Sequence, residues 1–293
     1  MRLSNQSPTF EGRALPHPTE PVFDQGLGFD VETLLDRRKV LKVIGYGAAT
    51  AGLFTLAGCL PGASGSLAPS ATGTAAAGTS GAACAVIPEE TAGPFPGDGS
   101  NGPDILTQSG VVRADIRSSF GSSTTLATGV PLTVKLAIQD LKNGCGPLAN
   151  AAVYIWHCDQ AGRYSMYSNG ATSENYLRGV QAAGADGIVT FQSVFPACYS
   201  GRWPHIHFEV YPSLPKATDP ANRIATSQIA LPEATCREVY ATSGYEQSVT
   251  NLGQVSLASD MVFGDDGAIH ELGTISGGIA AGLTVELGVP VNA

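Results

Sequence analysis

The sequence after residue 130 is dominated by short runs of β-branched and aromatic residues, each bounded by turn-forming residues such as glycine, proline or asparagine. Runs of this length, with partial alternation of apolar and polar residues, predict β-strands. The four clearest runs are Val130–Asp140, Ala152–Cys158, Gly187–Pro196 and His205–Tyr211. No long segment with a period of 3.6 residues follows Cys59, so few helices are expected. The pattern predicts an all-β fold, a β-sandwich of mostly antiparallel strands with long loops that form the active site.

The number and sign of the charged residues limit the kinds of molecule that the protein is expected to bind. Only 14% of the residues are charged, and the formal net charge is −9. Residues 1–58 contain six Lys/Arg and six Asp/Glu, so the rest of the chain keeps the full −9. Nucleic acid and anionic membrane surfaces are therefore excluded as expected partners of the folded part.

The N-terminal region has the layout of a bacterial export signal. The pair Arg37 and Arg38 precedes an almost charge-free run over residues 43–58, which is too short and glycine-rich for a transmembrane helix. The pair resembles a twin-arginine signal, and the small residues before Cys59 resemble a lipoprotein cleavage box. We expect residues 1–58 to be a leader and Cys59 to carry a lipid anchor. The alternative is a buried apolar helix with an incidental cysteine.

The remaining chain divides into a tether and a folded domain. Residues 59–83 are mostly Ala, Gly, Ser, Thr and Pro without charge, which predicts a flexible tether. Residues 84–293 are expected to form one catalytic domain of an exported cell-envelope or extracellular protein. In an oxidising compartment one or two disulfides are plausible, and the odd number of cysteines leaves at least one thiol free. The pairing stays open among Cys84, Cys145, Cys158, Cys198 and Cys236.

Two histidines open the last of the four runs. In a strand, the period of two sends His205 and His207 to one face, where they form a ready pair of metal ligands. By itself the pair is more often structural. The proline and glycine punctuation of residues 196–204 predicts a loop that folds Tyr199 over the same site, and Tyr164 follows the turn after the second run.

These residues belong to a longer pattern that spans Pro88 to Gln228. The chain resembles the intradiol ring-cleavage dioxygenases in the segments Trp156-His157-Cys158-Asp159-x-x-Gly162-x-Tyr164-Ser165, Leu177-Arg178-Gly179-x-Gln181, Asp186-Gly187 and Pro196-x-x-Tyr199-x-Gly201-Arg202-x-Pro204-His205-Ile206-His207. The resemblance implies a ferric ion, Fe(3+), with Tyr164 and His205 as equatorial ligands and Tyr199 and His207 as axial ligands.

The resemblance also implies an activity. O2 opens the ring of a catechol-type diol and yields a cis,cis-muconate-type dicarboxylic acid, while the diol displaces Tyr199, which leaves with a proton. Arg202 places a cation beside the developing negative charge, and Gln228 positions the ring or the hydroxide. The segment Pro88–Phe95 implies that the ring is bordered by Thr91, Gly93 and Pro94.

The ligand types favour ferric iron on chemical grounds as well. A free tyrosine has a pKa of about 10, so it binds as phenolate only to a strongly Lewis-acidic ion. Two phenolates and one hydroxide cancel three positive charges, which permits a site in an apolar cleft. A ferrous site of two histidines and one carboxylate would instead use Glu209, which projects to the same face.

The sequence is also compatible with two other functions. A copper or zinc oxygenase would use the same histidines and leave the tyrosines as spectators. A non-catalytic β-sandwich lipoprotein that binds a ligand would need no metal. No Lys/Arg cluster is evident to hold a substrate carboxylate, which favours neutral catechols or hydroxyquinol over protocatechuate. The sequence is compatible with an oligomer.

Overall fold

The computed structural model describes residues 9–10, 13–14 and 84–293, which belong to two units, Met1–Ala82 and Ala83–Ala293. In the first unit, β1 (Thr9–Phe10) pairs antiparallel with β2 (Arg13–Ala14). Apart from these four residues, the predicted leader lies outside the described residues, as do the tether and the lipidation site at Cys59.

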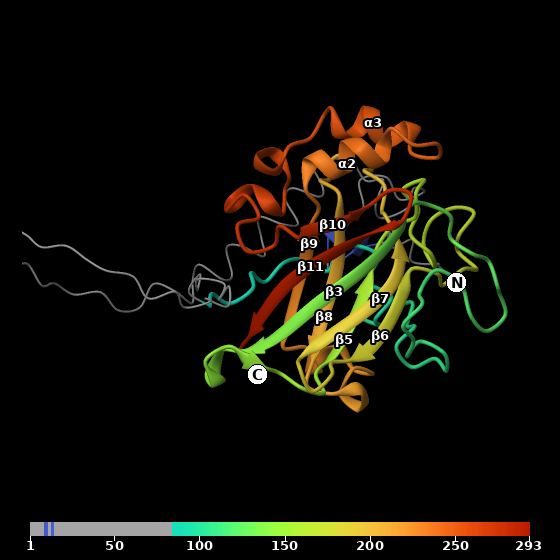
Figure 1. The fold of residues 1–293 in the computed structure, drawn as a ribbon. Coiled ribbons are helices and arrows are strands. Elements are labelled where there is room, and N and C mark those ends of the chain that lie inside the picture. The colour runs from blue at the N-terminus through green and yellow to red at the C-terminus, as the bar shows by residue number, and fades with distance from the viewer. Residues whose placement is uncertain (1–8, 11–12, 15–83) are drawn as a thin grey trace, which may run out of the picture. The chain divides into compact units, whose positions relative to one another are not determined.

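Nine strands of the second unit form two sheets (Figure 1). The first sheet contains β3 (Pro131–Asp140), β4 (Gly146–Pro147), β7 (Ile188–Val194), β10 (Thr274–Gly278) and β11 (Gly282–Val291). The second has the order β6-β5-β8-β9 and contains β5 (Ala152–Trp156), β6 (Arg178–Ala182), β8 (His205–Tyr211) and β9 (Ala225–Ala230). All pairings in these sheets are antiparallel except the parallel pair of β11 and β3. The predicted all-β sandwich is confirmed.

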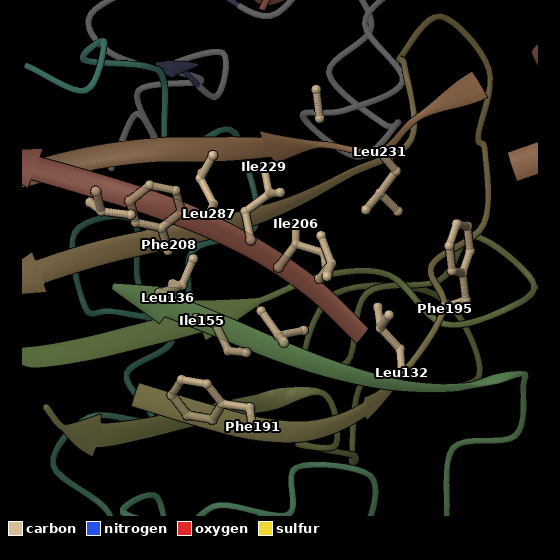
Figure 2. Close-up of a cluster of buried hydrophobic side chains, with 14 of the residues drawn as sticks. Leu132, Leu136, Ile155, Phe191, Phe195, Ile206, Phe208, Ile229, Leu231 and Leu287 are labelled. Carbon is tan, nitrogen blue, oxygen red and sulfur yellow. The ribbon is translucent and has the colours of Figure 1, made fainter. Parts of the chain in front are cut away.

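The core lies between the two sheets. On β8, Ile206 and Phe208 point inward and are fully buried, and they belong to the same apolar cluster as Leu132 and Leu136 of β3 (Figure 2). Because side chains alternate along a strand, this burial turns His205 and the other odd-numbered residues of β8 to the outer face of the second sheet. The interior is thus apolar, and the outer face is free to carry chemistry.

A second apolar cluster covers that outer face. Tyr154 and Trp156 of β5 pack there with Ile105 and Leu106 from the loops before β3 and with Tyr164 from the loop after β5. The loops therefore bury the outer side of β5 and β8 as well as the inner side. This second layer is where a site beside His205 and His207 becomes enclosed.

Helices are few among the described residues, as expected. The α-helices are α2 (Glu233–Tyr240) and α3 (Glu246–Leu252), which follow β9 and lie at one end of the sandwich (Figure 1). The short 3-10 helices are η2 (Leu141–Asn143), η3 (Leu214–Lys216), η4 (Pro220–Asn222), η5 (Leu257–Ser259) and η6 (Phe263–Asp265). No helix in the described part has the length and hydropathy needed for a membrane span.

The cysteines of the second unit fall into two groups. Cys84 and Cys145 form a disulfide that ties the start of the domain to the loop between β3 and β4. Cys158, Cys198 and Cys236 are free and buried. The structure therefore selects one pairing from the several that the sequence allowed.

Candidate metal centre

Strand β8 brings the two histidines together at its N-terminal end. His205 and His207 are 2% and 3% exposed, and their Nε2 atoms lie 3.1 Å apart. The Nδ1–H of His205 donates to the carbonyl oxygen of Trp203 at 2.5 Å, which directs the Nε2 lone pair toward His207. The His207 ring stacks on Trp156, with centroids 4.8 Å apart and an interplanar angle of 5°. Both imidazoles are therefore held in fixed orientations.

The first tyrosine is presented by a turn that Asp159 organises at the end of β5. The Asp159 carboxylate accepts from the backbone N–H of Ala161 at 2.9 Å and of Arg163 at 3.0 Å. It also accepts from the Tyr176 hydroxyl at 2.9 Å. This turn places Tyr164, 2% exposed, over the outer face of the sheet. Arg178 donates to the Ser165 carbonyl oxygen at 2.9 Å and to the Ser165 hydroxyl at 3.0 Å, and these bonds brace the loop.

The second tyrosine comes from the loop before β8, and α3 anchors that loop. The N–H of Cys198 donates to the Ser248 hydroxyl at 3.0 Å, and Asn251 donates to the Cys198 carbonyl oxygen at 2.8 Å. Tyr199 follows directly and is only partly buried. The two tyrosine loops approach closely at Gly162, whose φ is +82° and where a Cβ would lie 3.4 Å from the Cβ of Tyr199.

The four side chains meet at one point. The Tyr164 hydroxyl lies 3.5 Å from the Tyr199 hydroxyl and 3.4 Å from His205 Nε2, and the Tyr199 hydroxyl lies 3.2 Å from His205 Nε2. Donor atoms bound at about 2 Å to one metal ion are separated by roughly 3 to 3.5 Å, so this spacing fits a shared ion. Within residues 84–293 the buried Nδ1 of His207 has no hydrogen-bond partner, so the orientation of that ring depends on its stacking and on the group that Nε2 binds.

Burial sets the charge of these groups in the absence of a cation. Burial raises the pKa of Tyr164 well above its usual value and that of Tyr199 to about 12. Burial, together with the positive charge of Arg202, lowers the pKa of His205 well below its usual value. The imidazoles are therefore neutral acceptors, and a strong cation is required to bring the phenols into the phenolate form. Oxygen ligands that become anionic on binding suit a hard trivalent ion.

The carboxylate alternative does not fit this geometry. Glu209 lies on the same face of β8, but its carboxylate accepts from Arg223 at 2.7 Å and from the Tyr211 hydroxyl at 2.7 Å. No group of three or more His, Cys, Asp or Glu side chains suited to a metal ion occurs in the part of the chain that the structure describes. His157 bonds to Ser193 at 2.6 Å and is not part of the cluster. The atoms closest to the two imidazoles are instead the phenol oxygens of Tyr164 and Tyr199.

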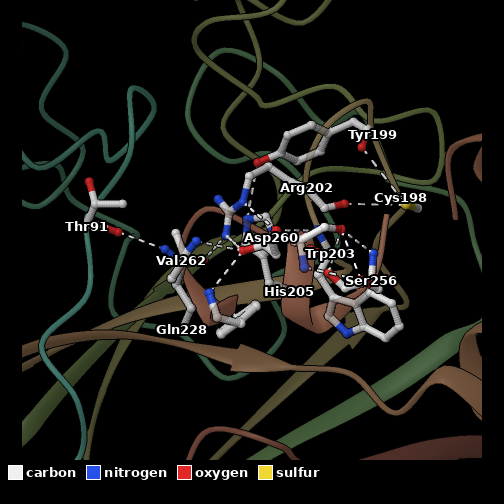
Figure 3. A network of polar contacts seen from close by, with 12 residues as sticks. Thr91, Cys198, Tyr199, Arg202, Trp203, His205, Gln228, Ser256, Asp260 and Val262 are labelled. Atoms are coloured by element: carbon white, nitrogen blue, oxygen red, sulfur yellow. Dashed lines mark hydrogen bonds and ion pairs between the residues drawn. The ribbon is translucent and has the colours of Figure 1, made fainter. Parts of the chain in front are cut away.

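A polar network borders the cluster (Figure 3). Arg202 is 8% exposed, and its Nη2 donates to the Gln228 side-chain oxygen at 2.7 Å. The Gln228 amide in turn donates to the Thr91 carbonyl oxygen at 2.9 Å. On its other side Arg202 forms an ion pair with buried Asp260 at 3.0 Å. Gln228 therefore bonds to Arg202 and to the wall of the site.

The predicted substrate-contact segment lies against the histidines in part. Gly93 has a φ of +68°, and a Cβ there would lie 3.4 Å from His207 Cε1. Its N–H donates to the Thr91 hydroxyl at 3.0 Å, whereas Pro94 is exposed. Phe95, which was not among the predicted contacts, packs on Tyr164 with ring centroids 4.8 Å apart. The segment borders the cluster mainly through Gly93 and Phe95.

Comparison with known proteins identifies dioxygenases as similar to this chain. Residues 102–213, which include all four clustered side chains, match a family model described as "Dioxygenase". Among solved structures, the chain is similar to an intradiol ring-cleavage dioxygenase from Tetranychus urticae, with 25% identity and a TM-score of 0.57. That match covers 71% of this chain and 95% of the other. The chain is a homologue of the intradiol ring-cleavage dioxygenases.

Two further solved structures are similar to this dioxygenase homologue. A second dioxygenase crystal structure matches with 26% identity and a TM-score of 0.56, over 71% of this chain and 95% of the other. The dioxygenase domain of a fusion protein from Streptomyces sp. SirexAA-E matches with 21% identity and a TM-score of 0.46, over 71% and 99%. No curated protein matches the chain. Homology to this oxidoreductase family supports cleavage of catechol-type rings in general.

Two residues at the candidate metal centre were not predicted from the sequence. Asp260 lies 58 residues after Arg202 in the chain and belongs to no recognisable motif, so no local signal indicated its role. Phe95 ends the segment that implied Thr91, Gly93 and Pro94, and its aromatic ring was the available signal.

Proposed function

We propose that the protein is a mononuclear ferric iron enzyme that cleaves catechol-type diols with O2 between the two hydroxylated carbons. Both atoms of O2 enter the product, a cis,cis-muconate-type dicarboxylic acid, so no external reductant is needed. The observation that carries this proposal is the convergence of two phenol oxygens and two imidazole nitrogens, with the distances of 3.1–3.5 Å given above.

Tyr164, Tyr199, His205 and His207 would hold the ion. A bound ferric ion supplies Lewis acidity that activates the chelated diol toward O2. Tyr164 is enclosed by Phe95 and the sheet, whereas Tyr199 is partly exposed. Tyr199 is therefore the phenol placed to make room for an entering diol, and its oxygen would take one of the diol's protons.

Arg202 and Trp203 have supporting roles in this proposal. The Arg202 guanidinium is nearly buried, so its positive charge acts through little water on negative charge that develops in the cleft. The Trp203 carbonyl oxygen accepts from His205 and keeps that imidazole in the tautomer that offers Nε2 to the ion.

The substrate class follows from the wall of the site. Gly93 and Phe95 offer a small residue and an aromatic ring beside the cluster. Arg202 is paired with Asp260, and Arg178, which lies behind Phe95, gives its N–H donors to protein oxygens. Neither guanidinium is thus placed to pair with a carboxylate on the ring, so neutral catechols or hydroxyquinol are the proposed substrates over protocatechuate.

Replacing one phenol tests the ligand assignment. Iron-loaded wild-type protein is expected to absorb visible light through ferric tyrosinate and to change colour when catechol is added under nitrogen. Tyr164→Phe should lose or sharply shift this absorption and lose more than about 100-fold in kcat, because one phenolate is removed. The matched control is Tyr167→Phe, whose hydroxyl bonds to Asn101 and Gly97 rather than to the cluster and whose removal should leave the band in place.

Two outcomes would contradict the proposal. An unchanged spectrum and activity in Tyr164→Phe would remove Tyr164 from the ligand set. Colourless, iron-free protein from iron-replete cells would favour a ligand-binding sandwich without catalysis, an alternative that gains no support from the comparisons.

We also propose that the chain is exported through its twin-arginine-like signal and anchored by a lipid at Cys59. The support is the sequence layout around Arg37, Arg38 and Cys59. Replacing Arg37 and Arg38 by lysine should keep the protein in the cytoplasmic fraction. Cys59→Ser should prevent labelling with a radioactive fatty acid. Export of the double-lysine variant at the wild-type level would rule out the twin-arginine route.

A further inference from the structure

Asp260 is a buried carboxylate next to the candidate metal centre, and it lies in the segment between η5 and η6. It accepts from three backbone N–H groups, those of Trp203 at 2.6 Å, Val262 at 2.9 Å and Phe263 at 3.1 Å. It also accepts from Arg202, from Nε at 3.0 Å and from Nη2 at 3.4 Å. These bonds fix the carboxylate itself in one position.

The guanidinium of Arg202 is consequently held on two sides. Nε bonds to Asp260, and Nη2 bonds to the Gln228 side-chain oxygen at 2.7 Å. The guanidinium carbon lies 5.9 Å from the centroid of the Phe263 ring. Nη1 of Arg202 makes no hydrogen bond within the described residues, so its N–H groups remain free to donate to a ligand.

The charges explain why this arrangement helps the site. The Asp260 carboxylate is shared among three amides and one guanidinium, so it offsets only part of the Arg202 charge. Arg202 Nη2 bonds to Gln228, which is the residue of β9 that pairs with His207 of β8, so the guanidinium lies beside the cluster. The guanidinium thus acts on the cluster, while Asp260 stabilises its burial and removes its rotamer freedom.

We propose that Asp260 is a positioning residue for ring cleavage, because it orients the Arg202 guanidinium so that Nη1 donates to the negative charge developing on the bound diol. The inference rests on the proposed function. It adds a residue from the segment after α3 to a site otherwise built from residues up to and including β9. Asp260 itself does not contact the diol in this proposal.

A double-mutant cycle tests the coupling. Asp260→Asn and Arg202→Gln should each lower kcat by roughly 10- to 100-fold and change KM less, because the lost interaction is made in the transition state. The double variant should lose no more than the worse single variant, since Asp260 acts through Arg202. A merely structural Asp260 would give losses that multiply, and that result would overturn the proposal.

A second variant guards against a failure of Asp260→Asn to fold. Arg202→Lys keeps a positive charge beside an intact Asp260, but its single ammonium nitrogen cannot occupy the separate positions from which Nε, Nη2 and Nη1 of the guanidinium donate. Its kcat should fall by a similar factor, and a wild-type kcat would show that orientation is not needed. The matched control is Asp115→Asn, which removes an exposed ion pair with Arg117 and should leave kcat unchanged.

A readout that needs no iron separates this inference from the proposed function. In 15N NMR of the apoprotein, the buried Nε–H of Arg202 should give a slowly exchanging signal that is absent in Arg202→Gln and loses its protection in Asp260→Asn. Retained protection in Asp260→Asn would overturn the inference alone. Iron-loaded wild-type protein without ring cleavage would overturn the proposed function, and the inference with it.

Discussion

At the scale of single residues, burial decides which groups carry charge, and Glu271 shows this away from the metal centre. Its side chain is fully buried, Ser227 donates to its Oε1 at 3.4 Å, and its Oε2 has no hydrogen-bond partner in the part of the chain that the structure describes. Burial first, and then the negative charges of Glu90 and Asp266, raise the pKa of Glu271 from 4.5 to about 8. The folded state therefore holds a proton that the unfolded state releases above pH 4.5.

This shift gives a pH dependence with a defined sign. The contribution of Glu271 to stability is fully present below its unfolded pKa of 4.5 and is lost as pH rises through about 8. Glu271→Gln stays neutral, so its free energy of unfolding in urea, relative to wild type, should increase from pH 5 to pH 9. The control Glu286→Gln removes an exposed carboxylate paired with Lys135 and should show no such trend. Parallel curves for Glu271→Gln and wild type would contradict the prediction.

At the scale of elements, the site depends on α3, which contributes no ligand. Asn251 is the donor to the carbonyl oxygen of Cys198, directly before Tyr199. Asn251→Ala leaves that buried carbonyl unpaired, so the free energy of unfolding should fall by about 1–3 kcal/mol. The looser Tyr199 loop should also weaken iron binding, measured by competition with a chelator. Thr250→Ala, at an exposed position of the same helix, is the control and should change neither quantity.

At the scale of the whole molecule, the site exists because both faces of the second sheet are covered, one by the first sheet and the other by loops. The inner face of β8 packs Ile206 and Phe208 into the core between the sheets, and the outer face carries His205 and His207 under the loops. Without the loop layer, the histidines would face water. The enclosure brings Tyr164 and Tyr199 from separate loops to the same point.

Much of this arrangement was predictable, because it depends on local pattern. The run His205–Tyr211 forms β8 with the predicted bounds, and Val130–Asp140 forms β3 after its first residue. The strands β6 and β9 were not predicted individually, since Arg178–Ala182 and Ala225–Ala230 lack a clear alternation and are defined by pairing with β5 and β8. The parallel pairing of β11 with β3 is likewise a long-range contact, in sheets whose other pairings are antiparallel as expected.

The sequence by itself determined four of the strands, the placement of the two histidines on one face and the presence of two tyrosines in loops, because periodicity and turn residues act over a few positions. Only the tertiary structure decided that these loops converge, that Cys84 pairs with Cys145, and that Asp260 bonds to Arg202. Those contacts join residues far apart in the chain. They form only when burial of both faces of the second sheet offsets the entropy of ordering the loops.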